Sequence, residues 1–174
     1  MRRNWLATAA VAAAAISVPA TIIGGTAQAA TLTGQQKAAA PSAIKKVNPL
    51  FNQKAAALAR RLVGDPYVSG GTTPAGFDCS GLALYVYEHT GGGKTVPRTA
   101  EDQFRRFRRI SLANAVPGDL VFFHDTSSPS SYVYHVGVYE GGKNIVAAAT
   151  PGAGVLLQSF TWAGDTVTFG TITH

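Results

Sequence analysis

The chain has 174 residues, of which 46% are hydrophobic and 14% are charged, and its formal net charge is +6. That size and composition support one globular domain with a real core rather than two domains. A basic chain favours anionic partners such as nucleic acid, acidic lipid or acidic wall polymers. Arg2 and Arg3 supply part of the charge from the N-terminal segment described next, so the remaining excess is modest and does not require nucleic acid.

Residues 1–29 have the pattern of a secretory signal. A basic start at residues 1–3 precedes an uncharged run at 6–23, and Ala27 and Ala29 place small residues where a signal peptidase reads. The alternative is a membrane anchor, but the run is rich in Ala and interrupted by Pro and Gly. We therefore expect a secreted chain without a stable membrane anchor after cleavage. The segment is compatible with export by either the Sec pathway or the twin-arginine pathway.

The single cysteine, Cys79, is the next informative feature. An exported chain with one cysteine has no internal disulfide, so a reactive thiol, an intermolecular bridge and an inert buried cysteine remain as alternatives.

The predicted organisation is a flexible leader at 30–48 followed by one folded domain at 49–174. A first helix begins at Pro49, carries apolar residues at helical spacing and can end at Gly64. A loop at 64–78 leads to the second helix. That second helix is predicted from residue 79 to about 89, with Asp78 as its cap.

A third, short helix is predicted after a capped start at residues 99–102, and it carries Phe104 and Phe107. Four arginines fall on this predicted helix, where they form either a solvated basic face or a contact for anionic wall polymer. They are Arg105, Arg106, Arg108 and Arg109.

The second half of the chain is rich in β-prone segments separated by Gly, Pro or Ser turns. Helices followed by a run of strands predict an α+β domain with a mainly antiparallel sheet. The predicted strands are 120–124, 133–139, 144–149, 155–160 and 166–173.

Cys79 is placed for nucleophilic chemistry because a thiol at a helix N-terminus faces unpaired N–H groups and the positive end of the helix dipole. These groups predict a lowered thiol pKa, and the same N–H groups could hold a developing oxyanion. Such a thiol needs a base. His89 lies about ten residues along the same helix, roughly 15 Å away, which leaves His124 and His135 in the strand half. Gly137, on the face of His135, leaves room beside that imidazole.

Four short motifs, in order, resemble those of the NlpC family of cell-wall cysteine peptidases. Residues 70–82 read GGTTPAGFDCSGL, 97–99 read PRT, 117–123 read PGDLVFF and 135–139 read HVGVY. The resemblance extends over about residues 50–170.

The resemblance implies a papain-like α+β domain in which the Cys helix packs on a mainly antiparallel sheet of about five or six strands. It implies secretion, association with the cell wall and hydrolysis of amide bonds in peptidoglycan stem peptides, often between D-glutamate and diaminopimelate. Cys79 matches the nucleophile, His135 the base and Tyr67 a tyrosine near the oxyanion site.

The resemblance also assigns roles around the nucleophile. Asp78 and Ser80 match positions that help to hold substrate in relatives, although Asp78 is equally a helix cap. Arg98 is either a ligand for a wall-peptide carboxylate or a surface residue.

Two positions depart from the family pattern. Ser69 stands where relatives commonly have Trp, which alters a subsite. The third catalytic position lies about twelve residues after the His and is His, Asn, Gln or Glu in relatives, but here the count falls on Ala147. A backbone carbonyl, water or another residue must then orient His135, or activity is reduced.

Three functions remain possible: the wall peptidase, an inactive wall-binding or regulatory module, and an amidase or transferase acting on another amide. We expect peptidoglycan and, as a further partner, anionic wall polymer. We expect a monomer that binds no nucleic acid, metal or cofactor, since no metal or phosphate motif is present.

Overall fold

The structure is a computed structural model that describes residues 49–91, 94–127, 131–162 and 164–173. These residues belong to one compact unit spanning 41–174. The predicted signal at 1–29 and leader at 30–48 lie outside the described residues. Of the helices in the described ranges, none has the length and apolar character needed to cross a membrane.

The helices lie where the sequence predicts them. Helix α1 spans Pro49–Arg61, α2 spans Cys79–His89 and α3 spans Ala100–Arg106. The side chain of Asp78 caps α2, and that of Thr99 caps α3 by accepting the N–H of Asp102.

Six of the strands form one antiparallel sheet in the order β3-β8-β4-β5-β6-β7. This arrangement confirms the predicted α+β class with a mainly antiparallel sheet. Its strands are β3 (Arg108–Ile110), β4 (Leu120–Asp125), β5 (Tyr132–Gly141), β6 (Asn144–Ala148), β7 (Val155–Ser159) and β8 (Thr166–Thr171).

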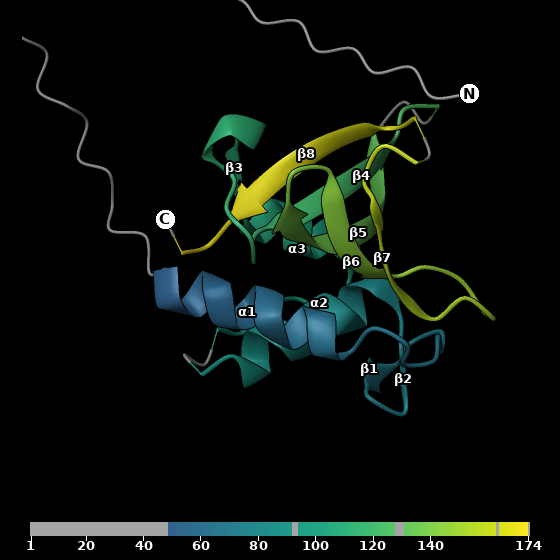
Figure 1. The fold of residues 1–174 in the computed structure, drawn as a ribbon. Helices are drawn as coiled ribbons and strands as arrows, with labels where there is room; N and C mark the ends of the chain where they lie inside the picture. The colour runs from purple at the N-terminus through teal and green to yellow at the C-terminus, as the bar shows by residue number, and fades with distance from the viewer. Residues whose placement is uncertain (1–48, 92–93, 128–130, 163, 174) are drawn as a thin grey trace, which may run out of the picture. The chain divides into compact units, whose positions relative to one another are not determined.

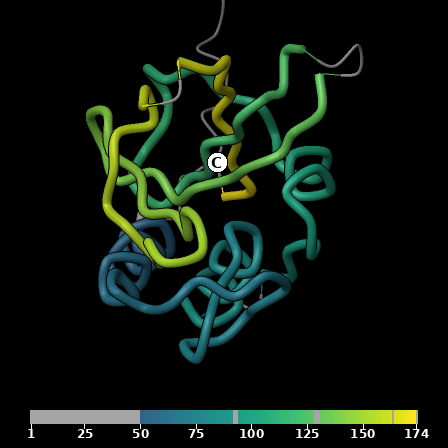
Figure 2. The backbone as a smooth tube through the Cα atoms, turned by 90° about the vertical axis from the view of Figure 1, so that its right-hand side faces the viewer, coloured from purple at the N-terminus to yellow at the C-terminus, as the bar shows by residue number. Residues whose placement is uncertain are grey.

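Helices α1 and α2 lie side by side against the sheet and both contact β5, as Figures 1 and 2 show from two directions. The main core lies between these layers and includes Phe77, Leu82, Val136 and Val138. A second cluster, which includes Phe123, Ile145 and Ala147, is formed by other residues of the same sheet. Strand β5 is therefore covered by side chains of both clusters, which fixes its position against α2.

The PGDLVFF motif builds a structural corner. Gly118 has a φ of +98°, and a Cβ there would lie 2.2 Å from the carbonyl oxygen of Asn52. Asp119 is buried and accepts hydrogen bonds from the Asn52 side chain and the Val116 backbone. The motif thus joins α1 to the start of β4.

Two sequence predictions were wrong in detail. Arg108 and Arg109 lie in β3 rather than on the third helix, because α3 ends at Arg106 and Phe107 adopts an extended conformation as its C-cap. The segment predicted as loop also contains a two-stranded hairpin of β1 (Thr72–Thr73) and β2 (Gly76–Phe77). These strands are too short to show a repeating pattern.

Candidate active site

Cys79 is the first residue of α2, as the sequence predicts. Asp78 accepts the N–H of Gly81 at 2.7 Å, which closes the first turn of the helix. A side chain at position 81 is excluded, since its Cβ would lie 1.9 Å from the carbonyl oxygen of Gly71. The DCSG sequence therefore caps the helix and lets the preceding loop pack closely against it.

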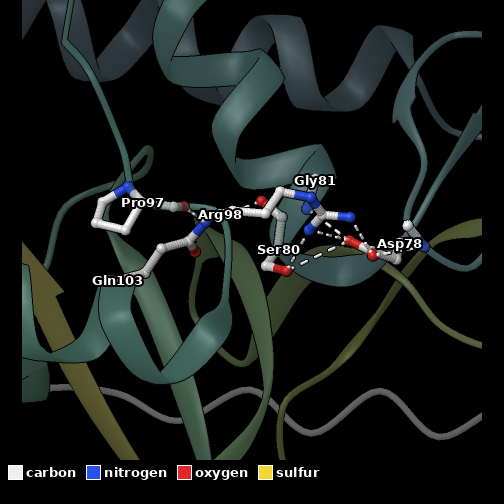
Figure 3. Close-up of polar contacts among 7 residues, drawn as sticks. Asp78, Ser80, Gly81, Pro97, Arg98 and Gln103 are labelled. Carbon is white, nitrogen blue, oxygen red and sulfur yellow. Dashed lines mark hydrogen bonds and ion pairs between the residues drawn. The ribbon is translucent and has the colours of Figure 1, made fainter.

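A polar network surrounds the start of this helix (Figure 3). Arg98 donates to both carboxylate oxygens of Asp78 and, at 2.9 Å, to the hydroxyl of Ser80. Burial alone would raise the pKa of Asp78, but the bonds from Arg98 and from the Gly81 N–H outweigh it and hold that pKa below its usual value. Buried Gln103 donates to the carbonyl oxygens of Ser80 and Pro97.

This network bears on the two roles predicted for Asp78, helix cap or substrate contact, and on the two predicted for Arg98, carboxylate ligand or surface residue. Asp78 is a helix cap. Arg98 is half-buried and engaged by Asp78, so it is not a free surface residue. Its guanidinium is held beside the nucleophile with part of its surface open to a ligand.

His135 lies on β5 beside Cys79. The backbone N–H of Val136, the residue after His135, acts on the Cys79 thiol and lowers its pKa. The imidazole is 7% exposed, and its centroid lies 5.1 Å from the ring of Phe123. The structure therefore brings together the two residues that the sequence predicts as nucleophile and base.

A pocket of about 440 Å³ opens at this point. Its walls come from the α2 start, β5, β7 and the loops around them. The lining residues are Tyr67, Cys79, Tyr134, His135, Ala148, Ala149, Thr150, Ala153, Leu156, Gln158 and Trp162.

Burial dominates the electrostatics of the Cys–His pair. It raises the pKa of Cys79, and the N–H groups of Val136, Ser80 and Cys79 only partly offset this effect. Burial also lowers the pKa of His135 from 6.5 to about 4. The predicted lowering of the thiol pKa is therefore wrong, because desolvation of a thiolate at this site exceeds the gain from the helix N-terminus. Both pKa shifts favour a neutral thiol and a neutral imidazole.

The other described histidines are occupied elsewhere. His124 is buried, with one ring nitrogen 2.8 Å from the Thr168 hydroxyl and the other 3.2 Å from the Ser131 carbonyl oxygen. His89 is exposed at the end of α2, where it stacks on Tyr85. Neither lines the pocket of Cys79.

Ala147 lies on the face of the sheet that carries His135. A Cβ built on Gly137 would lie 2.8 Å from Cδ1 of Ile145 and 3.3 Å from the Cβ of Ala147, so Gly137 allows these two side chains to pack closely beside it. Nε2 of His135 is buried and has no hydrogen-bond partner among the described residues. The methyl group of Ala147 cannot provide that partner, as the sequence predicts.

Tyr67 lines the same pocket as Cys79 and is half-buried. Its backbone forms an isolated bridge to Phe77, which fixes the loop before the nucleophile. Burial raises the pKa of Tyr67, and the negative charges of a Cys79 thiolate and of Asp78 add to this effect. The phenol is therefore a neutral donor near the thiol.

Several lining residues were not predicted from the sequence. Tyr134 lies at an irregularity between β4 and β5, where Phe123 pairs with His135 but His124 pairs with Val133. Trp162 lies in the loop after β7. Gln158 lies near the end of β7, which reads VLLQS, and no local pattern in that strand marks it as a pocket residue. Within the described ranges there is no group of three or more side chains suited to a metal.

Comparison with known proteins gives a consistent result. Residues 64–170, more than half of the chain, match the NlpC/P60 family. The chain is 39% identical over 92 residues to gamma-DL-glutamyl hydrolase of Bacillus subtilis, covering 52% of this chain and 22% of that protein. It is also 39% identical over 111 residues to the bifunctional muramidase/DL-endopeptidase CwlT of the same species, covering 63% of this chain and 33% of that protein. The chain thus spans no more than a third of these relatives.

Among solved structures, the NlpC/p60 domain of the peptidoglycan hydrolase SagA is similar with a TM-score of 0.60 and 32% identity. The match covers 69% of this chain and 98% of that domain. The α+β fold agrees with this similarity, and the chain belongs to the NlpC/P60 family.

Proposed function

We propose that this protein is a cysteine peptidase that hydrolyses amide bonds in peptidoglycan stem peptides. The observation that carries the proposal is that Cys79, at the N-terminus of α2, and His135, on β5, line the same pocket. A nucleophile, an adjacent base and an open pocket are the parts that acyl transfer requires.

The reaction begins with two neutral groups. The Cys79 thiol gives its proton to His135 as the sulfur attacks the carbonyl carbon of the scissile amide. The resulting oxyanion is stabilised by backbone N–H at the start of α2 and by the hydroxyl of Tyr67. His135 then returns the proton to the leaving nitrogen as the C–N bond breaks. Water, deprotonated by His135, hydrolyses the thioester and restores the thiol.

The bond that we propose is the D-glutamyl–diaminopimelate type. Two relatives are named gamma-DL-glutamyl hydrolase and DL-endopeptidase. Arg98 is paired with Asp78 but keeps 39% of its side chain exposed, and we propose that this exposed part contacts a free carboxylate such as that of D-glutamate. Ser80 and Asp78 hold Arg98 in place.

This function places the protein outside the cell at the wall. The signal pattern at 1–29 supports secretion, and the net charge of +4 that remains without Arg2 and Arg3 supports contact with anionic wall polymer. We propose that the mature chain acts as a monomer without a membrane anchor or cofactor.

The test is to incubate the purified chain with peptidoglycan and identify the released peptides by mass spectrometry. Cys79→Ala, which removes the nucleophile in a half-buried position, is the matched control. New N-terminal diaminopimelate in the wild-type digest, absent from the control, is expected. Intact stem peptides at every enzyme concentration would contradict the proposal.

The unpartnered Nε2 of His135 gives a specific reason to test a second function, an inactive wall-binding or regulatory module. Sedimentation of the chain with insoluble peptidoglycan, without release of peptide, favours that function. Turnover of a non-wall amide, such as a protein glutamine side chain, would instead indicate the amidase or transferase alternative.

A further inference from the structure

We infer that Trp162 and Tyr134 form a binding site for an uncharged sugar ring of the glycan strand that carries the stem peptide. These two residues, called the aromatic wall below, line the same pocket as Cys79. The inference rests on the proposed peptidase function for the identity of the glycan, and its second experiment tests the sugar site without turnover.

Both side chains of the aromatic wall are exposed although they line a pocket. Trp162 is 59% exposed and Tyr134 is 41% exposed, so the fold itself covers only part of either ring. Aromatic side chains at a concave site are typical of ligand contact, because each ring removes a large apolar area from water when a ligand covers it. The aromatic wall therefore offers apolar surface to a ligand next to the nucleophile.

A side-chain hydrogen bond holds the aromatic wall in place. The hydroxyl of Tyr134 donates to the carboxylate of Asp165, and Trp162 lies three residues before Asp165 in the loop between β7 and β8. Three residues span at most about 11 Å, so this bond limits how far the backbone of Trp162 can lie from the end of the Tyr134 side chain. Burial, together with the bond and charge of Asp165, raises the pKa of Tyr134 to about 12, so the phenol stays protonated and keeps donating. The ring of Tyr134 lies 6.3 Å from that of His135, which places the wall beside the base.

The charge of the pocket selects against an ionic ligand. Its described lining residues include no Lys, Arg, Asp or Glu, and the pKa shifts of Cys79 and His135 favour their neutral forms. A free diaminopimelate side chain ends in an ammonium and a carboxylate, which would lose hydration there without gaining a charged partner. The carboxylate of D-glutamate is assigned to Arg98 under the proposed function. The uncharged parts of the substrate that remain are its alanine residue and its N-acetylated sugar.

Of these two parts, the sugar suits the aromatic wall better. A pyranose ring has flat faces of C–H groups that pack on aromatic rings, and it carries hydroxyl and acetamido groups at its edge. Thr150 and Gln158 line the same pocket and supply a hydroxyl and an amide for that edge. A single alanine methyl group would cover little of two exposed rings. The sugar is joined to the stem two residues from the proposed scissile bond, about 7 Å along an extended chain, so a substrate positioned at Cys79 brings it near the pocket.

The kinetic test compares a stem peptide that carries its N-acetylmuramoyl sugar with the same peptide without it. We expect the wild type to have a kcat/KM about tenfold higher for the sugar-bearing peptide, which corresponds to about 1.4 kcal/mol. Trp162→Ala should remove this preference, and Trp162→Phe, which keeps an aromatic face, should retain part of it. Tyr132→Ala is the matched control, because Tyr132 is 48% exposed on the strand of Tyr134 but does not line the pocket. We expect the control to keep the wild-type preference.

Two kinetic results would overturn the inference. A wild type that cleaves both substrates equally well gains nothing from a sugar at this pocket. A Trp162→Ala variant that cleaves both substrates more slowly, but keeps the wild-type preference, would show that the aromatic wall contacts the peptide instead.

The fluorescence of Trp162 tests binding without turnover. The chain has two tryptophans, so Trp5→Phe/Cys79→Ala leaves Trp162 as the only one and removes the nucleophile. We expect N-acetylmuramoyl-L-alanyl-D-glutamate to shift the emission to shorter wavelength and L-alanyl-D-glutamate at the same concentration to leave it unchanged. Adding Tyr134→Ala should weaken binding of the sugar-bearing ligand.

This binding experiment separates the sugar site from the peptidase function. Equal responses to the two ligands, or no response to either, would refute the sugar site even if the chain cleaves peptidoglycan. A response to the sugar-bearing ligand alone, in a chain that cleaves no wall peptide, would support the sugar site and contradict only the peptidase function.

Discussion

Arg98 donates to both carboxylate oxygens of Asp78, and Asp78 caps the helix that begins at Cys79. One carboxylate therefore serves two purposes: it closes the first turn of α2, and it holds the guanidinium beside the nucleophile. Asp78 also accepts the N–H of Gly70, which ties the preceding loop to the same point. Changes at Asp78 and Arg98 should therefore affect stability and catalysis to different extents.

Replacing Asp78 by Ala should lower the free energy of unfolding by about 1 kcal/mol through loss of the cap. Asp78→Asn keeps an acceptor for the Gly81 N–H and should cost less, although it loses the ion pair with Arg98. Urea unfolding of both variants measures the difference. Equal losses would indicate that the charge, rather than the cap, provides the stability.

The Cys79 thiol should titrate above its ordinary pKa of about 8.5, because burial raises the pKa of this thiol. The rate of alkylation by iodoacetamide, measured against pH, gives the midpoint, and Cys79 is the only thiol in the chain. The same chain in denaturant is the matched reference for an unperturbed cysteine. A midpoint near 6 in the folded protein would mean that the pair rests as thiolate and imidazolium instead.

Acid should destabilise the fold through His135. Burial lowers the pKa of His135 from 6.5 to about 4, so the unfolded chain takes up a proton at a pH where the folded chain does not. The imidazole is neutral in both states above pH 6.5, and stability is lost as the pH falls from there toward 4. By linkage the loss reaches about 3 kcal/mol.

The measurement compares unfolding free energies at pH 7 and pH 4 for Cys79→Ala and for Cys79→Ala/His135→Leu. The first variant should lose more stability than the second, since only it retains the buried imidazole. Parallel losses would show that other groups cause the acid sensitivity.

Cys79→Ala and His135→Ala should each abolish hydrolysis of wall peptides while leaving thermal stability near that of the wild type. The double variant should be no worse than either single variant, because the two groups act as a unit. Initial rates on purified stem peptide measure this. If His135→Ala keeps most of the activity and His124→Ala loses it, the base has been misassigned.

The sequence predicted the helices and the antiparallel sheet because short-range signals specify them, and Asp78 and Thr99 mark two of the helix starts. The choice of His135 rather than His124 as the base rested instead on the family resemblance, and its catalytic role stays a prediction. The pKa of Cys79 could not be predicted in the same way, since it depends on how deeply α2 packs against β5. Gln158 was missed for a related reason, because its place in the pocket depends on how β7 pairs with β6.

Ala147 has no hydrogen-bonding side chain with which to orient His135. Relatives place an orienting side chain there, but here Nε2 of His135 is buried without a partner. A thiol is easier to ionise than a hydroxyl, so loss of the orienting group should cost a cysteine enzyme less than a serine enzyme. Ala147→His and Ala147→Asn should therefore change kcat by about tenfold or less, or about 1.4 kcal/mol of barrier. Ala147 is fully buried beside Ile145, so the added side chain requires neighbouring side chains to shift. Steady-state kinetics on stem peptide provide the measurement. A wild-type chain with no detectable turnover that becomes strongly active on Ala147→His would show that the natural protein is a disabled member of its family.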